Sequence, residues 1–295
     1  MKRMLLIINT KSGKTKSKSR FFHIIDRFDD NGFCVTVTVT RSPGHGIEIA
    51  KKGSISGNFD YIVCAGGDGT YNEVVNGVVS GNRDVFVGYI PAGSTNDFAA
   101  SMNIEADILK AVDRVVSGKP HPIDIGLFND RYFSYIATFG AFTSASYNTP
   151  QSFKNVFGHM AYVLSGIKDI TAIQPYDVSV KTDKEDYNGE YIFGAVCNST
   201  SVGGLLKLDA DDVDMSDGLF EVILVRKPKN IVELNEIVWK SLASDFSGKM
   251  FEFIKVSEIE FLMPKGVSWS IDGEKIMGTE KTVIKNIHNA LNFIR

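Results

Sequence analysis

Two short segments of the chain combine glycines with small polar residues in an arrangement suited to phosphate binding. Residues 66–70 (GGDGT) follow the apolar run 61–65, and residues 93–99 (GSTNDFA) follow the apolar run 85–90. Glycine lets a backbone come close to a phosphate, and the N-terminus of a following helix offers unpaired N–H donors. Taken singly, either segment is equally well explained as a tight turn, but the pair favours phosphate binding.

An acidic residue stands in each segment, Asp68 in the first and Asp97 in the second. A bound polyphosphate would repel both carboxylates unless a cation lay between them. Mg²⁺ prefers oxygen ligands and is commonly held by one or two carboxylates together with phosphate oxygens. The alternative interpretation makes Asp97 a helix N-cap and Asp68 a turn residue.

Two well-known phosphate motifs do not fit these residues. Asn72 stands where a dinucleotide-binding fingerprint would have its third glycine. Ile8 stands where a Walker A loop that includes residues 13–15 would have its first glycine. The sequence therefore indicates a different class of phosphate site.

The elements that must position these segments follow a βαβ pattern up to about residue 125. Apolar runs predict strands at 4–8, 33–39, 61–65 and 85–90, and helical stretches lie at 17–30, 47–52, 71–80 and 104–118. The first helix is expected to bury five residues, Phe21, Phe22, Ile24, Ile25 and Phe28. A doubly wound α/β sheet of this kind brings the carboxyl ends of adjacent strands, and both glycine segments, to one crevice.

Beyond residue 125, longer strands and hairpin signals predict antiparallel β-structure. A turn at 184–189 is expected to join strands 176–182 and 190–197, and helices are expected at 158–170 and 231–242. We predict a first domain at 1–125, a second at 126–286 and a tail at 287–295, for which a return to the first domain is one option.

Composition narrows the class of protein. The 295 residues carry 32 basic and 35 acidic side chains, a balance that argues against a nucleic-acid binder. No apolar run approaches the roughly 18 residues that span a bilayer, so we expect lipid contact to be peripheral. Three cysteines without metal-ligand spacing, Cys34, Cys64 and Cys197, favour a reducing cytoplasmic compartment, and all three are expected in or near the core.

With these motifs, nearly the whole chain resembles the bacterial lipid kinases that have a diacylglycerol kinase catalytic domain, which are related to sphingosine and ceramide kinases and more distantly to NAD kinases. The Asn96-Asp97-Phe98-Ala99 part of the second segment is similar to the lipid branch. Further matches are Asn9, Thr40, and the segments 124–126, 217–219 and 272–274. The resemblance implies an α/β nucleotide domain followed by a β-sandwich domain, with the active site in the cleft between them.

The same resemblance implies roles for individual residues. Glu274 would be the general base, and Asp68, Asp97 and Asp124 would form the acid and magnesium network. The ATP site would be lined by Asn9, Thr40, Gly66, Gly67, Gly69, Thr70, Glu73, Gly93, Ser94 and Asn96. Asp217, with the backbone of Asp214 and Leu219, would hold a second, structural Mg²⁺. From the residues alone, 272–274 is a hairpin turn and the acidic loop around Asp217 is solvated.

Two further groups of residues are candidates for ligand contact. A basic run follows the first strand, and its Arg20 is the preferred contact for ATP phosphates or anionic headgroups, although most such runs form a solvated helix face. An aromatic-rich stretch, including Phe142, Tyr147 and Phe157, could meet an acyl chain or belong to an ordinary core.

The resulting hypothesis is an ATP- and Mg²⁺-dependent lipid kinase of the cytoplasmic membrane face that converts diacylglycerol to phosphatidic acid. Phosphatidylglycerol, a sphingoid base or NAD are alternative acceptors, and a non-catalytic nucleotide- or lipid-binding regulator is a second class of hypothesis. Edge strands of the second domain could pair in a homodimer or be covered within one chain.

Overall fold

The computed structural model describes residues 1–12, 18–81, 84–94, 96–140, 173–198, 201–202, 206–207 and 214–295, without the side chains of residues 18–20, 97, 101, 201–202 and 206–207. The chain forms two compact units. The α/β unit contains Met1–Ile125, Tyr132–Ser134 and His288–Arg295, and the β-rich unit contains Gly126–Arg131 and Tyr135–Ile287. The predicted helix at 158–170 and the aromatic stretch with Phe142, Tyr147 and Phe157 lie outside the described residues.

A parallel sheet forms the centre of the α/β unit. Its strands run in the order β2-β1-β3-β4 and are β1 (Lys2–Ile8), β2 (Phe33–Val39), β3 (Tyr61–Gly66) and β4 (Phe86–Pro91). β1, β3 and β4 are buried almost throughout, because helices cover both faces of the sheet. The end of β17 (Lys281–Ile294) adds a further parallel strand beside β4.

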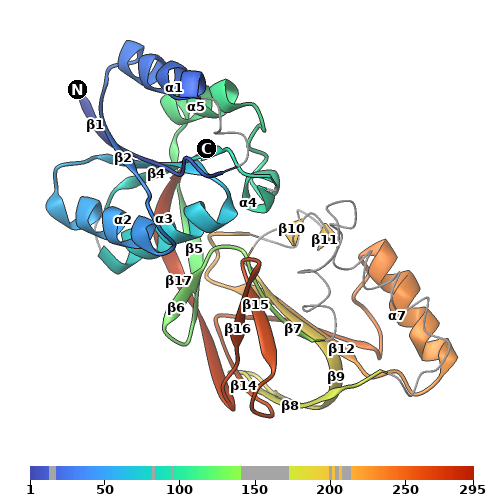
Figure 1. Ribbon diagram of the computed structural model, residues 1–295. Coiled ribbons are helices and arrows are strands. Elements are labelled where there is room, and N and C mark those ends of the chain that lie inside the picture. Colours follow the sequence, from blue (N-terminus) through green and yellow to red (C-terminus); the bar gives the residue numbers. More distant parts are fainter. Residues whose placement is uncertain are drawn as a thin grey trace. The chain divides into compact units, whose positions relative to one another are not determined.

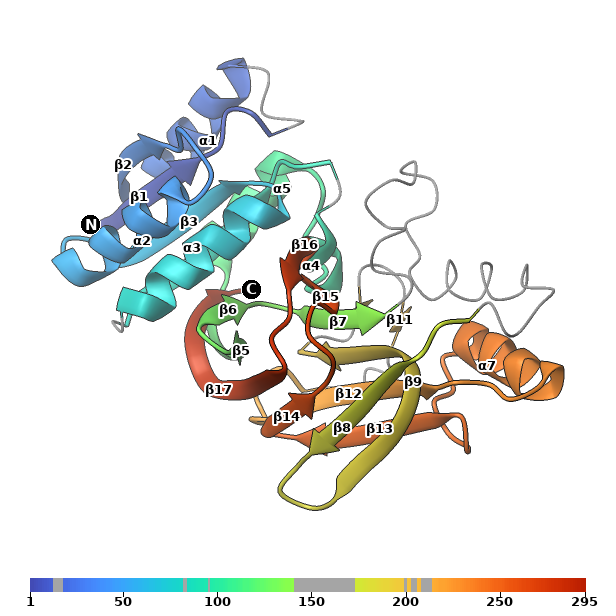
Figure 2. The ribbon, with the colours of Figure 1, turned by 60° about the horizontal axis from the view of Figure 1, so that its bottom comes forward.

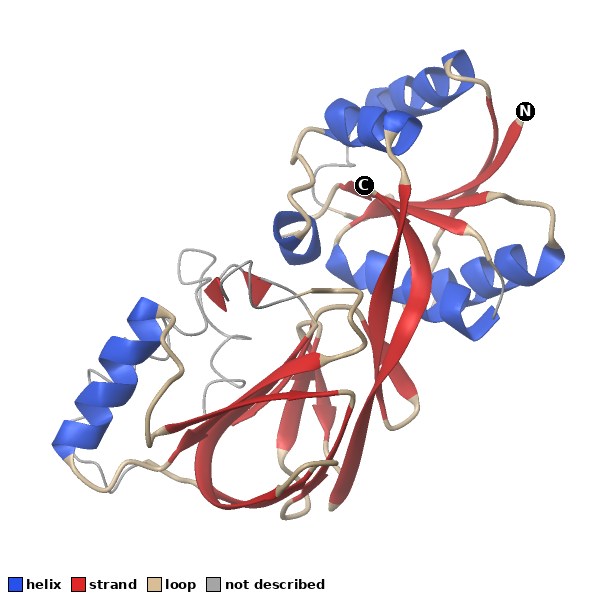
Figure 3. Ribbon diagram, turned by 180° about the vertical axis from the view of Figure 1, so that it is seen from behind, coloured by secondary structure: helices blue, strands red, loops and turns tan. Residues whose placement is uncertain are grey.

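Helices pack on both faces of this sheet (Figures 1 and 3). α1 (Lys18–Asp30) and α5 (Ile108–Ser117) pack together on one face, and α2 (His45–Ser56) and α3 (Asp68–Gly81) pack on the other. Figure 2 shows α2 and α3 side by side. A short helix, α4 (Asp97–Ser101), follows β4. The predicted doubly wound α/β fold is thus confirmed.

Several predicted boundaries and contacts were wrong in detail. α2 is longer than the predicted 47–52, and α3 begins at Asp68 rather than Tyr71, so its first turn lies inside the first glycine segment. α5 begins only at Ile108, because the side chain of Asp107 caps it by accepting hydrogen bonds from Leu109 and Lys110. On α1, Phe22 is exposed rather than buried.

The strand order places a topological switch point between β1 and β3. The chain moves from β1 to β2 on one side and from β3 to β4 on the other, so the connections leave the carboxyl ends of β1 and β3 in opposite directions. In open α/β sheets, ligands bind in the crevice at such a point. Asn9 and the first glycine segment follow these two strands.

The β-rich unit is antiparallel. Its main path runs β16-β15-β7-β9-β8-β14-β17, and β12 and β13 continue from β9. The strands are β7 (Ile136–Gly140), β8 (Tyr176–Lys181), β9 (Asp186–Cys197), β12 (Phe220–Arg226), β13 (Phe251–Val256), β14 (Glu258–Leu262), β15 (Ser268–Ile271) and β16 (Glu274–Met277). A short pair, β10 (Ser201–Val202) and β11 (Leu206–Lys207), forms a separate sheet, and α7 (Ile231–Ala243) confirms the helix predicted at 231–242.

Aromatic packing forms the centre of this unit. Trp269 is fully buried, and its ring centroid lies 4.9 Å from that of Phe139, 5.0 Å from that of Phe128 and 5.2 Å from that of Phe261.

The predicted β8–β9 hairpin is present, but Lys181 pairs with Asp186, so its turn is shorter and earlier than the predicted 184–189. β5 (Pro120–Phe128), β6 (Arg131–Phe133) and β17 each have residues in both units. Within the described residues, no helix is long and apolar enough to cross a membrane.

Candidate active site

The two glycine segments meet at the carboxyl ends of β3 and β4. The N–H of Ala92 donates to the carbonyl of Gly66 at 2.7 Å, which joins the two loops directly. A Cβ atom built on Gly93 would lie 2.5 Å from the Cα of Gly67, so the backbones are in contact where any side chain would separate them. The two backbone loops therefore lie side by side in this part of the α/β unit, and their joint binding of one ligand stays a prediction.

The side chain of Asn96 closes the second loop. Its Oδ1 accepts the N–H of Gly93 at 2.9 Å, and its Nδ2 donates to the carbonyl of the same residue at 3.0 Å. Asn96 is buried and adopts a left-handed conformation with φ 57°. Its amide thus holds the loop from within, whereas Ser94 is exposed at the rim of the loop.

Asp68 links the start of α3 to the start of α4. As the first residue of α3, Asp68 lies among the N–H groups of a helix N-terminus, where negative charge is favoured. Its Oδ1 accepts the N–H of Phe98 at 3.2 Å, so its carboxylate lies beside the backbone of the second loop. The side chain of Asp97 lies outside the described residues, so its predicted pairing with Asp68 stays a prediction.

An aromatic cluster packs against the starts of the two helices that follow the loops, and we call it the cluster under the loops. Phe98 stacks on Tyr71 of α3 with 4.1 Å between ring centroids, and the ring of Phe293 packs edge-on against both. Tyr89 of β4 completes the cluster and donates its hydroxyl to Asn96 at 3.3 Å. The cluster packs the starts of α3 and α4 against one core, and this fixes the spacing of the loops.

Residues at the end of β1 contact the first loop. Asn9 donates its Nδ2 to Thr70 Oγ1 at 2.9 Å, and its N–H donates to the carbonyl of Ala65 at 2.9 Å. Thr40 is tied by its N–H to the carbonyl of Ile8 at 2.9 Å. Asn9 thus lies at the switch point, next to the loop that carries the exposed Gly69, and Thr40 follows the neighbouring strand β2.

Glu73 on α3 has a structural task. Its two carboxylate oxygens accept the N–H groups of Gly44 at 2.7 Å and Gly46 at 2.8 Å, at the start of α2.

Burial raises the pKa of the nearby Cys64 thiol, and the charges of Glu73 and Asp68 act in the same direction. Cys64 and Cys197 are buried as predicted, whereas Cys34 is exposed on β2, contrary to the prediction.

Asp124 is held by partners that the sequence did not indicate. It is fully buried on β5, and its Oδ1 accepts the N–H of Asn289 at 2.8 Å and lies 3.0 Å from Nδ1 of His288. His288 had been given no role, because contacts over 164 residues of sequence leave no local pattern. The predicted role of Asp124 in the acid and magnesium network stays a prediction.

Glu274 is the first residue of β16 and directly follows a tight hairpin turn that joins β15 to β16. The turn consists of Asp272 and Gly273, with φ 46° and 83°, the left-handed pair that a two-residue hairpin turn requires. Asp272 is buried, and its Oδ1 accepts the N–H groups of Tyr135 and Ile136, each at 3.1 Å. The Glu274 carboxylate is half exposed and forms an ion pair with Arg131. No local motif marks Arg131, and the sequence predicts Asp272 only as part of the 272–274 hairpin turn.

The predicted second metal site is a loop closed by its own side chains. Asp217 Oδ1 accepts the N–H of Leu219 at 2.9 Å, and Asp214 Oδ1 accepts the N–H of Ser216 at 3.0 Å. Burial raises the pKa of the neighbouring Glu221 carboxyl to about 7, against the opposing charge of Lys255. Within the described residues, no three His, Cys, Asp or Glu side chains are grouped as a metal site.

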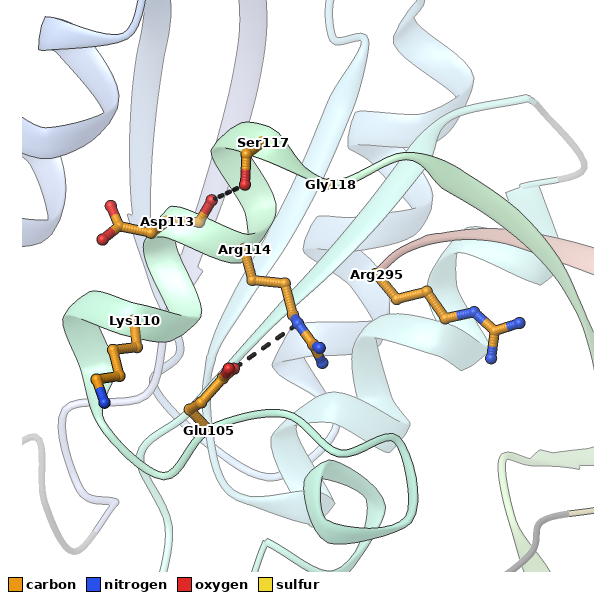
Figure 4. Close-up of a pocket in the computed structure, with 7 residues that line it drawn as sticks. All are labelled: Glu105, Lys110, Asp113, Arg114, Ser117, Gly118 and Arg295. Carbon is orange, nitrogen blue, oxygen red and sulfur yellow. Dashed lines mark hydrogen bonds and ion pairs between the residues drawn. The ribbon is translucent and has the colours of Figure 1, made fainter. Parts of the chain in front are cut away.

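A surface hollow of the α/β unit contains none of the predicted site residues. Figure 4 shows its lining, which consists of Glu105, Lys110, Asp113, Arg114, Ser117, Gly118 and Arg295. Two of its charged side chains are engaged within the protein, since Arg114 donates to the carbonyls of Met102 and Asn103 and Asp113 pairs with Arg27. We assign it no ligand. The side chain of Arg20 lies outside the described residues.

The fold and the paired loops define the class of protein as an α/β nucleotide- or phosphate-binding protein with a second, β-rich unit. A family model described as the diacylglycerol kinase catalytic domain matches residues 3–128. A diacylglycerol kinase of Bacillus subtilis (strain 168) is 33% identical over 276 residues, which cover 93% of this chain and 90% of that protein. One of Staphylococcus saprophyticus subsp. saprophyticus is 32% identical over 281 residues, covering 92% and 89%. The chain therefore belongs to the diacylglycerol kinase catalytic-domain family, and the predicted resemblance is confirmed.

Solved structures agree with the fold. A candidate diacylglycerol kinase from Bacillus anthracis str. Sterne superposes with a TM-score of 0.84 over 99% of this chain and 95% of that chain, at 20% identity. A second structure of a diacylglycerol kinase from the same organism gives 0.76 over 99% and 96%, at 19% identity. At this identity the likeness supports the architecture alone.

Proposed function

We propose that this protein is an ATP-dependent lipid kinase that phosphorylates the free hydroxyl of diacylglycerol to give phosphatidic acid. The observation that carries the proposal is the contact between the loops at Gly67 and Gly93, which brings together two glycine loops of the kind that bind phosphates through backbone N–H groups. Family membership supports the acceptor, because the relatives are named diacylglycerol kinases.

Phosphoryl transfer needs positioning, neutralisation of charge and an acceptor for the hydroxyl proton. The lipid hydroxyl oxygen bonds to the γ-phosphorus, the bond between that phosphorus and the bridging oxygen of ADP breaks, and the proton passes to Glu274. Asn9, Thr40 and the loop residues hold ATP in this proposal. The geometry that supports it lies at the switch point, where Asn9 contacts Thr70.

Asp68 and Asp97 are proposed to hold Mg²⁺ on the phosphates. The Asp68 carboxylate, which lies beside the backbone of the second loop, fits a metal that takes one or two carboxylates and completes its shell with phosphate oxygens and water. The ion would supply charge neutralisation on the β- and γ-phosphate oxygens. Asp217, with the backbone of Asp214 and Leu219, is proposed for a separate structural Mg²⁺.

A panel of acceptors tests the proposal. The protein is incubated with γ-labelled ATP, Mg²⁺ and mixed micelles that contain diacylglycerol, phosphatidylglycerol or a sphingoid base, and separately with NAD. We expect label in phosphatidic acid at a rate at least tenfold above the other products. Label in another product would replace the acceptor, and MgATP binding without any product would favour the regulator.

The proposed base gives a sharper prediction. Glu274→Gln keeps the size of the side chain but cannot accept the proton, so turnover should fall about a hundredfold or more, with the KM for ATP changed less than about twofold. The neighbouring exposed Lys275→Ala is the matched control and should keep full turnover. Unchanged turnover in the glutamine variant would remove the base from the mechanism.

The lipid substrate also indicates where in the cell the protein works. We propose that the protein works at the cytoplasmic face of the membrane by peripheral contact, since diacylglycerol is confined to the bilayer. Co-sedimentation with vesicles that contain diacylglycerol tests the contact, and sedimentation of the free protein tests whether edge strands pair in a homodimer.

A further inference from the structure

Glu274, the proposed base, has a charged partner on its own unit, Arg131. The two residues are separated by 143 positions in the sequence, and the guanidinium Nη2 of Arg131 donates to Oε2 of Glu274. Within the described residues, no other hydrogen-bonding or charged group contacts this carboxylate. Its other oxygen, Oε1, makes no hydrogen bond or ion pair with the part of the chain that the structure describes.

The backbones that carry the pair are anchored from both sides. The Asp272–Gly273 turn sets the backbone of Glu274, and the buried Asp272 side chain and N–H tie that turn to residues 135–136. On the other side, Asn129 precedes Arg131 in the β5–β6 turn. Its N–H donates to the carbonyl of Val283 at 2.8 Å, and its Oδ1 accepts the N–H of Val283 at 2.9 Å. Both residues therefore start from fixed positions.

The side chain of Glu274 lacks a comparable restraint from packing. It is 52% exposed, and a glutamate side chain in solvent samples many rotamers. A guanidinium that holds one carboxylate oxygen limits this freedom and leaves the second oxygen for the acceptor hydroxyl. Small displacements of a reacting group lower rates strongly, so this restraint would matter for turnover.

We infer that Arg131 is a positioning residue for phosphoryl transfer, because it holds Oε2 of Glu274 and directs Oε1 toward the acceptor hydroxyl. The inference rests on the proposed function, in which Glu274 is the base. Arg131 contacts the carboxylate rather than the reacting atoms, so it acts through Glu274. Exposed ion pairs contribute little to folding, and we expect the role of this pair to appear in rate rather than stability.

The test is a double-mutant cycle on the full chain, with diacylglycerol in mixed micelles and ATP. Arg131→Met keeps the aliphatic bulk and should lower kcat about tenfold or more, with the KM for ATP within about twofold and Tm within about 2 °C. Arg131→Lys retains a positive donor and should recover at least half of the lost turnover. In the Glu274→Gln background, Arg131→Met should have no further effect.

Lys285→Met is the matched control, because it breaks a similarly exposed ion pair of the same unit, with Glu258 at 3.0 Å. It should leave kcat unchanged. An active wild type whose Arg131→Met variant keeps full kcat would overturn the inference and leave the function intact. Equal losses from Arg131→Met in both backgrounds would overturn it too, because Arg131 would then act independently of Glu274. A wild type without lipid kinase activity would instead refute the proposed function.

Discussion

At the scale of single residues, the site depends on two glycines, because neither has a side chain to keep the loops apart. Gly67 and Gly93 let two loops touch, and the space for a Cβ on Gly93 is already taken by the Cα of Gly67 at 2.5 Å and Oδ1 of Asn96 at 2.8 Å. Both obstacles are held in place, one as backbone and the other by hydrogen bonds within the loop. The glycine is therefore required by the contact between loops, and only indirectly by the phosphate.

This contact gives a prediction for Gly93→Ala. The added methyl group must push the loops apart, which should cost about 1–3 kcal/mol of stability and raise the Kd for MgATP at least tenfold. Isothermal titration with MgATP and thermal unfolding measure the two effects. Lys110→Ala, an exposed change on α5 of the same unit and outside the proposed ATP site, should change neither. If Gly93→Ala bound MgATP as the wild type does, the loops would not be the nucleotide site.

At the scale of elements, one helix caps another. The N-cap of α2 is Gly44, which has no side chain to satisfy the first N–H groups. Glu73 of α3 accepts two of these N–H groups instead, and its negative charge lies at the positive end of the α2 dipole. The loop after Thr40 is thereby attached to the helix that begins at Asp68.

We expect Glu73→Ala to destabilise the protein by about 0.5–2 kcal/mol, the usual value of a lost cap, with faster amide exchange over the first turn of α2. Urea unfolding and hydrogen exchange measure this. Glu48→Ala, on the exposed side of the same turn, is the control and should be near neutral. If Glu73 instead binds ATP directly, as the resemblance predicts, its variant would weaken ATP binding without this loss of stability.

The sequence predicted elements better than it predicted contacts. The runs at 61–65 and 85–90 were recognisable because strands buried on both faces are continuously apolar. The start of α3 was missed because glycine and aspartate in residues 67–70 are equally typical of a loop. Phe22 was misplaced because a helical pattern defines an apolar face without its edges, and Phe22 lies where α1 meets solvent.

The same limit applies to the candidate site. The glycine loops could be named from local motifs, because each consists of neighbours in sequence. Asn9 and Glu274 were named only through the family resemblance, and their roles stay predictions. Arg131 and His288 could not be named in either way, since each contacts its acidic partner over more than a hundred residues of chain. No periodicity or spacing records such pairs, and only the folded chain brings them together.

At the scale of the whole molecule, the α/β unit is discontinuous in sequence. Residues His288–Arg295 belong to it although the β-rich unit intervenes. This segment supplies the parallel partner of β4, the ring of Phe293 under the loops, and the groups that hold the buried carboxylate of Asp124. The family match at residues 3–128 therefore ends before the unit is complete.

Truncation after Ile287 tests this dependence on the last strand. Loss of the buried Phe293 should cost about 1.5–3 kcal/mol, and loss of the contacts that His288 and Asn289 make with the buried Asp124 about 1–3 kcal/mol more. Together these are a large part of the 5–15 kcal/mol that stabilises a typical domain. The truncated chain should show a thermal transition at least 10 °C lower, with fast exchange over β4, while peptides of the β-rich unit stay protected. Deletion of Arg295 alone is the control and should shift the transition by less than a few degrees. An unchanged transition in the longer truncation would mean that the α/β unit is stable without its last strand, and that the cluster under the loops does not depend on Phe293.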